Sequence, residues 1–191
     1  MSSIISSIHY CPVKSLSFQS INICKIKKNL GILNDRIFAF SRSVDLEKAK
    51  SIEKNPNERK LLNFLTLKNS PFLNKYNFIY DLDKLTLRNN ENEEIITISI
   101  NKLNQFFLLS NKLLELENSL KEPIFLLKNN EFPFYDTSHS NKIFNSISLI
   151  NLNSISDFEK KTNKRIEFER FRGNFYIDGI EAWEERNWVG K

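Results

Sequence analysis

The chain has 191 residues, of which 40% are hydrophobic and 27% are charged, and its formal net charge is +5 at pH 7. This balance is typical of a folded globular protein and excludes a disordered chain. The positive charge is modest and there is no arginine-rich tract, which argues against a nucleic-acid partner and favours a small anionic ligand.

The N-terminal residues and the cysteines indicate where the protein works. Residues 1–10, MSSIISSIHY, lack the basic start and the continuous apolar stretch of a secretory signal. No apolar run approaches the roughly 20 residues that a membrane helix needs. Cys11 and Cys24 are the only cysteines, too few for a disulfide framework. We therefore expect a cytoplasmic protein without a membrane partner.

The first part of the chain is predicted to consist mainly of strands. Residues 21–27 alternate apolar and polar side chains with period two, which indicates a strand with one buried face, and a second strand is expected at 36–40. Residues 44–60 favour a short helix or a mobile excursion that ends near Pro56. Further strands are expected at residues 63–67, 76–80, 84–87 and 94–100, with a hairpin turn at 81–83.

The clearest helix is predicted over residues 101–120. Leucine and phenylalanine recur there at spacings of three and four, which places them on one face of a helix, and Pro123 ends it. A loop at 129–141 then leads to a strand at 146–150.

A short helix and a long strand are expected towards the end of the chain. Ser154 and Asp157 resemble a capping box that opens a helix through Thr162. Residues 166–177 have strand character and precede a turn at 178–179. The total is about nine strands and three helices without a regular alternation, which predicts a β-rich α+β fold with mostly antiparallel, barrel-like strands.

Familiar catalytic and metal-binding signatures are absent from the sequence. It has no Cys-x-x-Cys, His-Glu-x-x-His, phosphate loop or Gly-x-Ser-x-Gly motif. His9 and His139 lie far apart without neighbours at ligand spacing. We interpret both as ordinary polar or half-buried residues, and we predict no metal ligand.

Several scattered groups are suited to holding an oxyanion. Arginine presents a planar fork that binds phosphate or carboxylate through two parallel hydrogen bonds. Hydroxyl and amide groups satisfy the remaining lone pairs of such a ligand. The candidate groups are Lys14 and Ser15, Arg36, Thr137 and Ser138, and Arg172 with Asn174.

Each of these groups also has a plainer interpretation. Arg36 follows Asp35 and could form a surface ion pair of small energetic value. Lys14 in a loop could simply be solvated. Arg170 and Arg172 would share one face of the predicted final strand, as a salt-bridged solvent surface would require.

The order of certain short segments resembles a known family. YCPVKSL at residues 10–16, NDRIFAF, NFLTLKNSPFL, DTS, ISLINLNSI, and FRGN followed by DGIEAWEERNW occur in the order seen in MOSC-domain proteins that carry the associated N-terminal β-barrel domain. The chain is similar to the C-terminal part of molybdenum cofactor sulfurases and to the mitochondrial amidoxime-reducing component. The resemblance implies a β-barrel-like domain over 1–125 and an incomplete MOSC β-barrel over 126–191.

The function implied by the resemblance is binding of the molybdenum cofactor (molybdopterin) in a protein of an oxidoreductase or sulfur-transfer lineage. Lys14, Ser15 and Arg36 would meet the anionic end of the cofactor, and Thr66 matches a family threonine in a Thr-x-Arg-x-x-Pro segment. The family is also associated with pyridoxal phosphate, but no lysine of this chain is visibly poised to form a Schiff base.

The remaining matched positions are implied to hold the pterin side of the cofactor. Thr137 and Ser138 would contact the pterin or its phosphate, and Arg172 with Asn174 would hold the pterin. Two departures stand out: Gly173 replaces the proline of the family's Arg-Pro-Asn, and Lys68 stands where arginine is usual. Lysine cannot reproduce the bidentate fork of arginine.

The last departure from the family concerns its metal-binding cysteine. In the family, further strands follow the segment that ends here at Lys191, and they bring the thiolate that binds molybdenum. Neither Cys11 nor Cys24 matches that position. We therefore expect a truncated, inactive form with no assignable catalytic residue, and an unpaired sheet edge beside Phe175 and Ile177.

Two alternatives remain open at this level. A non-catalytic cofactor carrier or insertion module would need the anion site but no metal-binding thiolate. A structural or interaction β-barrel would need neither. An enzyme of this type would also require a small-molecule substrate and an electron-donor protein as partners.

Overall fold

The computed structural model describes residues 3–16, 18–43, 45–121, 123–135 and 146–190. The protein is a mixed α and β structure with several small, mostly antiparallel sheets and three α-helices among these residues. This agrees with the predicted α+β class. The strand pairings of the described residues form open sheets, so the barrel-like closure stays a prediction.

One part of the molecule, the core region, contains two sheets and two helices. β5 (Phe38–Arg42) pairs antiparallel with β9 (Ile124–Lys128). The second sheet is a meander of β6 (Tyr76–Asp81), β7 (Lys84–Asn89) and β8 (Glu94–Ser99). Against these strands pack α1 (Leu46–Lys54) and α2 (Leu103–Leu116). The predicted hairpin and both predicted helices are confirmed, and the boundary expected between 125 and 126 falls inside β9.

The other part, the β11 region, is organised around a four-stranded sheet in the order β10-β11-β1-β2. Its strands are β1 (Ile4–Tyr10), β2 (Gln19–Ile21), β10 (Leu149–Asn151) and β11 (Phe175–Asp178). β11 pairs antiparallel with β1 and parallel with β10. The expectation of an unpaired edge at Phe175 and Ile177 is therefore wrong, because β11 has a neighbour on each side.

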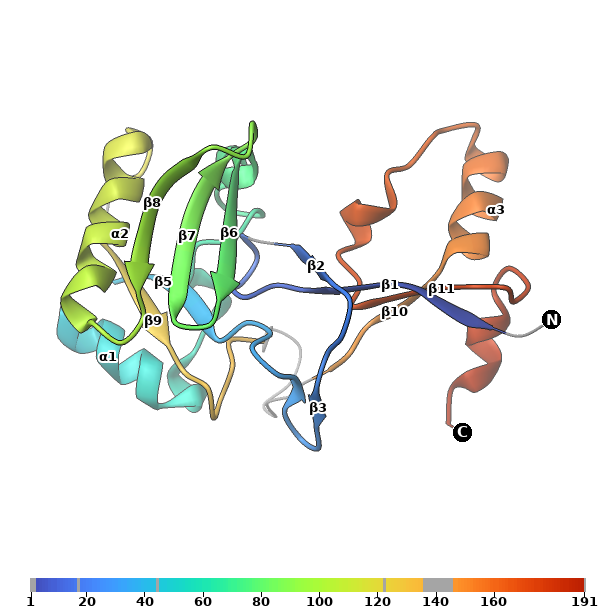
Figure 1. The fold of residues 1–191 in the computed structure, drawn as a ribbon, viewed down its shortest axis with the longest axis horizontal. Helices are drawn as coiled ribbons and strands as arrows, with labels where there is room; N and C mark the ends of the chain where they lie inside the picture. Colours follow the sequence, from blue (N-terminus) through green and yellow to red (C-terminus); the bar gives the residue numbers. More distant parts are fainter. Residues whose placement is uncertain (1–2, 17, 44, 122, 136–145, 191) are drawn as a thin grey trace.

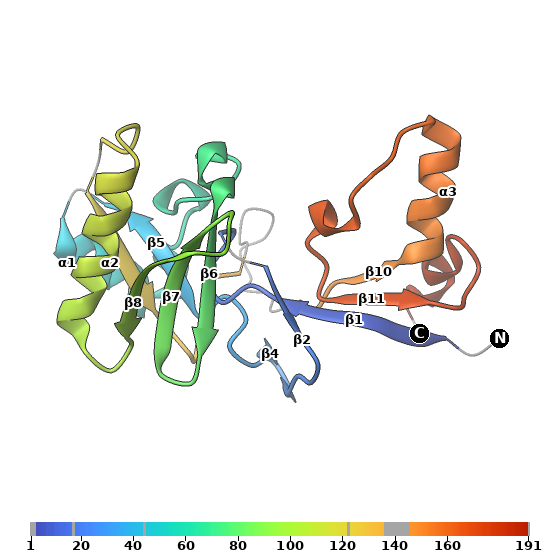
Figure 2. The same ribbon diagram turned by 45° about the horizontal axis from the view of Figure 1, so that its top comes forward.

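β1 connects the two parts. Figure 1 shows it running beside β11 from the N-terminus towards the core region, with both chain termini on the side of α3. Figure 2 shows α3 (Leu152–Thr162) above β10 and β11, at the end of the sheet that lies away from the meander. A small hairpin of β3 (Ile26–Lys27) and β4 (Gly31–Ile32) projects from the junction.

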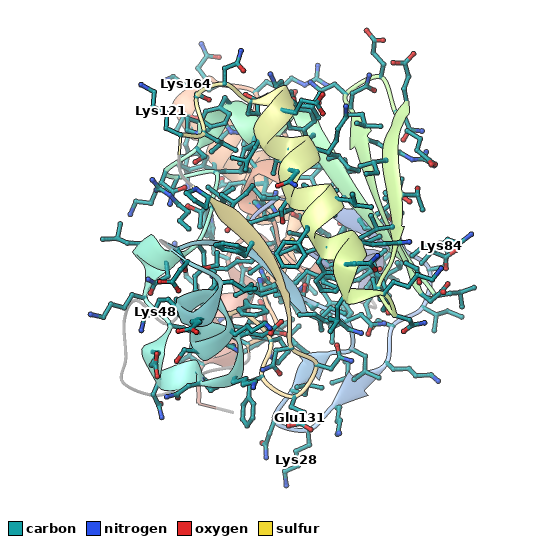
Figure 3. All side chains as sticks on the ribbon, turned by 90° about the vertical axis from the view of Figure 1, so that its left-hand side faces the viewer. Lys28, Lys48, Lys84, Lys121, Glu131 and Lys164 are labelled. Atoms are coloured by element: carbon teal, nitrogen blue, oxygen red, sulfur yellow. The ribbon has the colours of Figure 1, made fainter. Side chains whose placement is uncertain are left out.

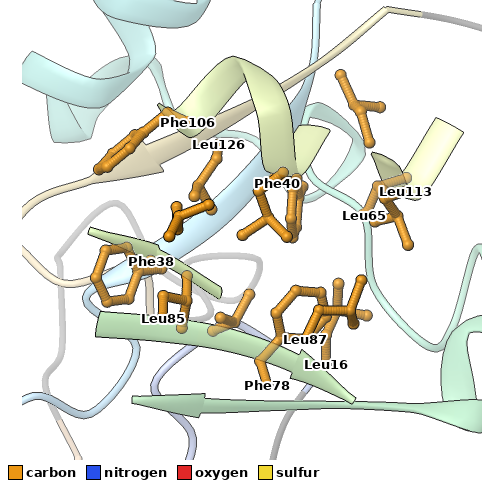
Figure 4. Packing of buried hydrophobic residues seen from close by; sticks show 14 of the residues in the cluster. Leu16, Phe38, Phe40, Leu65, Phe78, Leu85, Leu87, Phe106, Leu113 and Leu126 are labelled. Carbon is orange, nitrogen blue, oxygen red and sulfur yellow. The ribbon is translucent and has the colours of Figure 1, made fainter. Parts of the chain in front are cut away.

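The main hydrophobic core lies in the core region, between the meander, α2 and the β5–β9 pair. Figure 4 shows its aromatic side chains beside leucines that include Leu87 of β7, Leu113 of α2 and Leu126 of β9. The ring centroids of Phe40 and Phe78 lie 5.4 Å apart, and those of Phe38 and Phe106 lie 6.4 Å apart. Such aromatic pairs contribute about 0.5–1.5 kcal/mol beyond the area they bury.

Two predicted strands are missing, one of them wholly and the other in its middle. Residues 61–63 form a 3-10 helix, and only Phe64 makes an isolated bridge, to Ser41, so the strand at 63–67 is wrong. A turn follows it because the Thr66 backbone N–H donates to Asn69 Oδ1 over 2.9 Å. The strand at 21–27 is also wrong in its middle, where Ile23 is 84% exposed and has no buried face to occupy.

The long strand predicted at 166–177 is confirmed only at its end, where β11 begins at Phe175. Residues Phe168–Phe171 form a 3-10 helix, and Arg172 follows in the left-handed conformation. The Tyr176 hydroxyl stabilises this turn, because it donates to the Phe168 carbonyl over 3.1 Å and accepts from the Gly173 N–H over 3.0 Å. Arg170 and Arg172 therefore do not share the face of a strand.

α3 begins earlier than the capping box at Ser154 indicates. Asn151 caps it, with its side-chain oxygen accepting from the Asn153 N–H over 3.0 Å. The Ser154 hydroxyl instead binds the segment that follows β11: it donates to Glu185 and accepts from the Trp183 N–H. The remaining short 3-10 helices span Pro56–Glu58, Pro71–Lys75 and Glu184–Trp188.

Charged side chains cover the periphery of the core region. Figure 3 shows Lys28 and Glu131 at the end that carries the small hairpin, and Lys84 on the meander. Within the described ranges, no helix combines the length and the apolar character needed to span a membrane.

Candidate anion-binding site

A hollow of about 540 Å³ brings together six of the eight predicted site residues from four separate parts of the chain. We call these six residues the cradle. Its described lining also includes Lys68 but no acidic side chain. Thr137 and Ser138 lie outside the described residues. The cradle consists of Lys14, Ser15, Arg36, Thr66, Arg172 and Asn174.

The loop after β1 lies alongside the residues that lead into β5. Backbone hydrogen bonds between these two segments position Lys14, Ser15 and Arg36. The Lys14 N–H donates to the Phe38 carbonyl over 2.8 Å, and the Phe38 N–H donates to the Pro12 carbonyl over 3.0 Å. The Arg36 N–H donates to the Cys11 carbonyl over 2.6 Å. These bonds hold Lys14 and Ser15 beside Arg36, although about twenty residues separate them in the sequence.

Lys14 is 5% exposed, so the interpretation of a solvated loop lysine is wrong. Its Nζ donates to the Phe134 carbonyl over 3.1 Å and lies 5.8 Å from the centre of the Phe64 ring. Arg59 fixes the segment before Phe134, because its guanidinium donates to the carbonyls of Phe132 and Pro133.

Asp35 is the centre of the hydrogen-bond network behind the cradle. It is 1% exposed, and it pairs with Arg36, so this is not the surface ion pair considered above. Its Oδ1 accepts from the Cys11 N–H over 2.7 Å. Its Oδ2 accepts from the Arg36 guanidinium, and from Tyr135 Oη and Asn174 Nδ2 at 3.4 Å each.

Sequence reasoning missed the role of Asp35, although its position beside Arg36 was a usable signal. Burial, and then the Asp35 carboxylate, raise the pKa of Tyr135, so its hydroxyl stays protonated and can donate to Asp35. Asp35 therefore orients Arg36 and links it to residues from three other parts of the chain. It acts on the cradle by positioning, because it does not line the hollow itself.

Arg172 contacts Cys11 at the junction of the two parts. Its Nη2 lies 3.2 Å from Cys11 Sγ, and its guanidinium lies 5.5 Å from the centre of the Phe18 ring. Cys11 is 2% exposed. Burial raises the pKa of Cys11, although Arg172 and Arg36 oppose this, so the thiol stays protonated at neutral pH.

Asn174 forms part of the wall and is 2% exposed. Its Oδ1 accepts from the Ser148 N–H and hydroxyl, both at 3.1 Å, and its Nδ2 donates to the His9 carbonyl over 3.2 Å. A Cβ on the preceding Gly173 would clash with the Ile150 side chain, which explains why glycine stands at this position. Asn174 thus fixes the distance between β1, β11 and the segment before β10.

Three cradle residues have a left-handed backbone, which is costly for any residue other than glycine. The φ angles are 61° at Ser15, 55° at Arg36 and 51° at Arg172. Elsewhere in the described chain, the non-glycine residues with positive φ are mostly asparagine, which tolerates this conformation. Each strained residue costs about 1–3 kcal/mol, and such residues concentrate at functional sites.

Thr66 and Lys68 form the opposite wall. Thr66 is 4% exposed, and its Oγ1 accepts from the Asn69 N–H over 3.3 Å within the turn. Lys68 is exposed at the rim of the hollow. The Lys68 ammonium supplies positive charge there without the fixed geometry of an arginine.

Among the described residues, no group of three or more His, Cys, Asp and Glu side chains is arranged to hold a metal ion. His9 is 8% exposed and stacks on Phe18 with ring centroids 4.5 Å apart. Its Nε2 lies 3.0 Å from Ser7 Oγ. His139 lies outside the described residues.

Comparisons with known proteins leave the resemblance untested. No family model matches the chain, and no curated protein matches it. The feature of the molecule that indicates a function is the cradle, a hollow lined by basic side chains from distant parts of the sequence, with arginines held by hydrogen bonds and buried polar groups.

Proposed function

We propose that the protein binds a phosphate-bearing cofactor of the molybdopterin type in the cradle. The single observation that carries this proposal is the convergence of Lys14, Arg36 and Arg172 on one hollow without an acidic side chain in its described lining. A volume of about 540 Å³ suits a small-molecule ligand, for which pockets of roughly 300–1,000 Å³ are usual.

The charges of the cradle fit an anion with more than one negative charge. Arg36 pairs with Asp35 behind the wall, and Lys14, Lys68 and Arg172 line the same hollow. Hydrogen bonds from a charged donor to phosphate contribute about 1.5–3 kcal/mol each. The Ser15 and Thr66 hydroxyls lie on the same hollow and suit the neutral polar edge of such a ligand.

The strained backbone at Ser15, Arg36 and Arg172 further supports a ligand site. Strain persists where the surrounding structure holds it, and here it keeps polar side chains aimed at one volume before any ligand arrives. A preorganised site loses less entropy on binding.

The residues that would hold the group are those of the cradle, with Lys68 at the rim. When bound, the group would supply a redox-active metal for chemistry of an oxidoreductase or sulfur-transfer type, in a complete MOSC-like protein whose sheets close into barrels. The residues of this chain would bind and orient the pterin phosphate. Cys11 is buried and protonated behind Arg172, which does not suit it as a thiolate ligand.

Cofactor retention by Arg172→Ala tests the proposal. The chain is expressed in a host that makes the molybdenum cofactor, and the bound pterin is released, oxidised and quantified by fluorescence. Loss of a charge-assisted bidentate contact should reduce retention, and the affinity for inorganic phosphate measured by calorimetry, by about 10- to 100-fold.

Arg170→Ala is the matched control. Arg170 is exposed, lies two residues from Arg172 and is absent from the cradle lining. Its substitution should leave both measurements unchanged. Equal effects of the two substitutions, or an unmodified chain that retains neither pterin nor phosphate, would contradict the proposal.

A further inference from the structure

A second, apolar hollow adjoins the cradle. Its volume is about 280 Å³, and it lies over β10 between α3 and the segments that flank β11. We call it the chamber. Its apolar lining consists of Leu149, Ile150, Ile155, Phe158, Phe171 and Trp183.

The chamber and the cradle share a wall. Phe171 lines both hollows. Ser148 and Arg172 face the cradle, whereas their immediate neighbours Leu149 and Phe171 line the chamber. At both places, adjacent residues of the chain line different hollows. A molecule in the chamber would lie next to a ligand in the cradle, on the other side of the wall that Phe171 helps to form.

The chamber presents apolar surface that folding has left accessible. Phe171 is 47% exposed, Phe158 is 42% exposed and Leu149 is 40% exposed. Clustered exposed apolar side chains around a concavity mark binding sites more often than isolated ones do. Three of the walls are aromatic, and aromatic faces favour stacking or edge contacts with another ring.

Among the lining residues that the structure describes, the one charged side chain of the chamber is acidic. Asn151 Nδ2 and Ser154 Oγ donate to the Glu185 carboxylate over 2.8 and 2.7 Å. Partial burial raises the pKa of Glu185, but these hydrogen bonds outweigh it and the net pKa is lowered, so the carboxylate is ionised at neutral pH. Its charge disfavours an anion in the chamber, whereas the cradle beside it attracts one.

We propose that the chamber binds an uncharged aromatic substrate and presents it, past Phe171, to the group held in the cradle. The substrate role rests on the proposed function of the cradle. A cavity of about 150 Å³ holds benzene, so a chamber of about 280 Å³ accommodates two fused rings. The ionised carboxylate and the apolar walls together select uncharged rings over aromatic anions.

Calorimetry with three probes tests the proposal: 2-naphthol, 2-naphthoate and inorganic phosphate. The uncharged 2-naphthol should bind at least ten times more tightly than 2-naphthoate. Saturation with phosphate should leave its affinity within twofold, because the two hollows are separate. Trp183 lines the chamber, so its fluorescence in a Trp188→Phe background should change on adding 2-naphthol.

A substitution that fills the chamber is compared with the same substitution at a position outside it. Leu149→Trp should weaken 2-naphthol binding at least tenfold and leave phosphate binding unchanged. Leu108→Trp, on a 54% exposed position of α2, should change neither. Phe158→Ala removes one aromatic wall and should weaken 2-naphthol binding about tenfold. Circular dichroism identifies any variant that fails to fold.

The possible results separate this inference from the proposed function. Phosphate binding without 2-naphthol binding overturns the chamber and leaves the cradle intact. Binding of 2-naphthol without phosphate binding overturns the proposed function, and with it the substrate role. Competition between the two probes, or equal loss in Leu149→Trp and Leu108→Trp, overturns the chamber as a separate site.

Discussion

The core region and the β11 region bury different kinds of side chain. Between the meander, α2 and the β5–β9 pair, the buried cluster is apolar and rich in phenylalanine. Around β11, Asn151, Ser154 and Asn174 are buried with their polar groups hydrogen-bonded, and several large apolar side chains stay exposed. The first region is stabilised by packing and the second mainly by a polar network, and the second supplies the wall between the two hollows.

The largest expected effect is that of Phe78→Ala. Phe78 is 1% exposed in the centre of the main core, and removing a buried phenyl ring costs about 3–5 kcal/mol of unfolding free energy. Urea denaturation measures the change. The same substitution at Phe158 in the β11 region, which is 42% exposed, should cost less than about 1 kcal/mol. Similar losses at both positions would contradict the contrast between the regions.

Asn174→Ala should destabilise the protein by about 2–3 kcal/mol, because it leaves the Ser148 N–H and the His9 carbonyl without their side-chain partner. The effect should exceed that of Asn130→Ala, at an exposed position, measured by the same denaturation. A loss below 0.5 kcal/mol, on the scale of ordinary surface substitutions, would show that the polar network is not what stabilises this region.

Glu185→Gln should cost about 1–2 kcal/mol at pH 7, because the amide replaces a carboxylate that accepts two hydrogen bonds. Since the folded pKa lies below the ordinary value of 4.5, the carboxylate stabilises the fold above that pH. Its contribution disappears as the pH falls through the folded pKa. The difference between the two proteins should therefore be constant from pH 6 to 8 and shrink below about pH 4.5; a constant difference at all pH values would argue against the ionised form.

His9→Phe should have the smallest effect, within about 1 kcal/mol at pH 8. Burial lowers the pKa of His9, although Glu169 opposes this, and its buried Nδ1 has no hydrogen-bond partner. Neutral His9 contributes stability above its ordinary pKa of 6.5 that is lost as the pH falls through the folded value. The variant should therefore lose less stability than the unmodified protein between pH 7 and 5, and identical pH profiles would exclude this role.

Sequence patterns predicted the core region better than the β11 region, for a physical reason. α2 and the hairpin of β6 and β7 bury apolar side chains at regular spacings, so their periods are visible in the sequence. In the β11 region the decisive contacts are hydrogen bonds of polar side chains, such as those of the Tyr176 hydroxyl with the Gly173 N–H and the Phe168 carbonyl. These contacts convert a strand-like stretch into a turn, and they have no sequence period.

The candidate site was likewise predictable only in part. The chemistry of Lys14, Arg36 and Arg172 indicated an anion site, and the structure brings them to one hollow. Asp35 looked like a surface residue because burial cannot be read from one ion pair in a sequence. The chamber was not predicted, because its aromatic walls come from three segments that only the tertiary structure assembles.

The pairing of β1 with β11 also affects how the protein matures. Ile4 pairs with Asp178, so the antiparallel partner of β1 emerges from the ribosome only after the whole core region has been synthesised. At about 5–20 residues per second, β1 would wait roughly 10–30 s beside a core region that can already pack. During this interval Ile4 and Ile5 belong to a strand without its main neighbour, which makes the nascent chain a natural client for chaperones that recognise extended apolar segments.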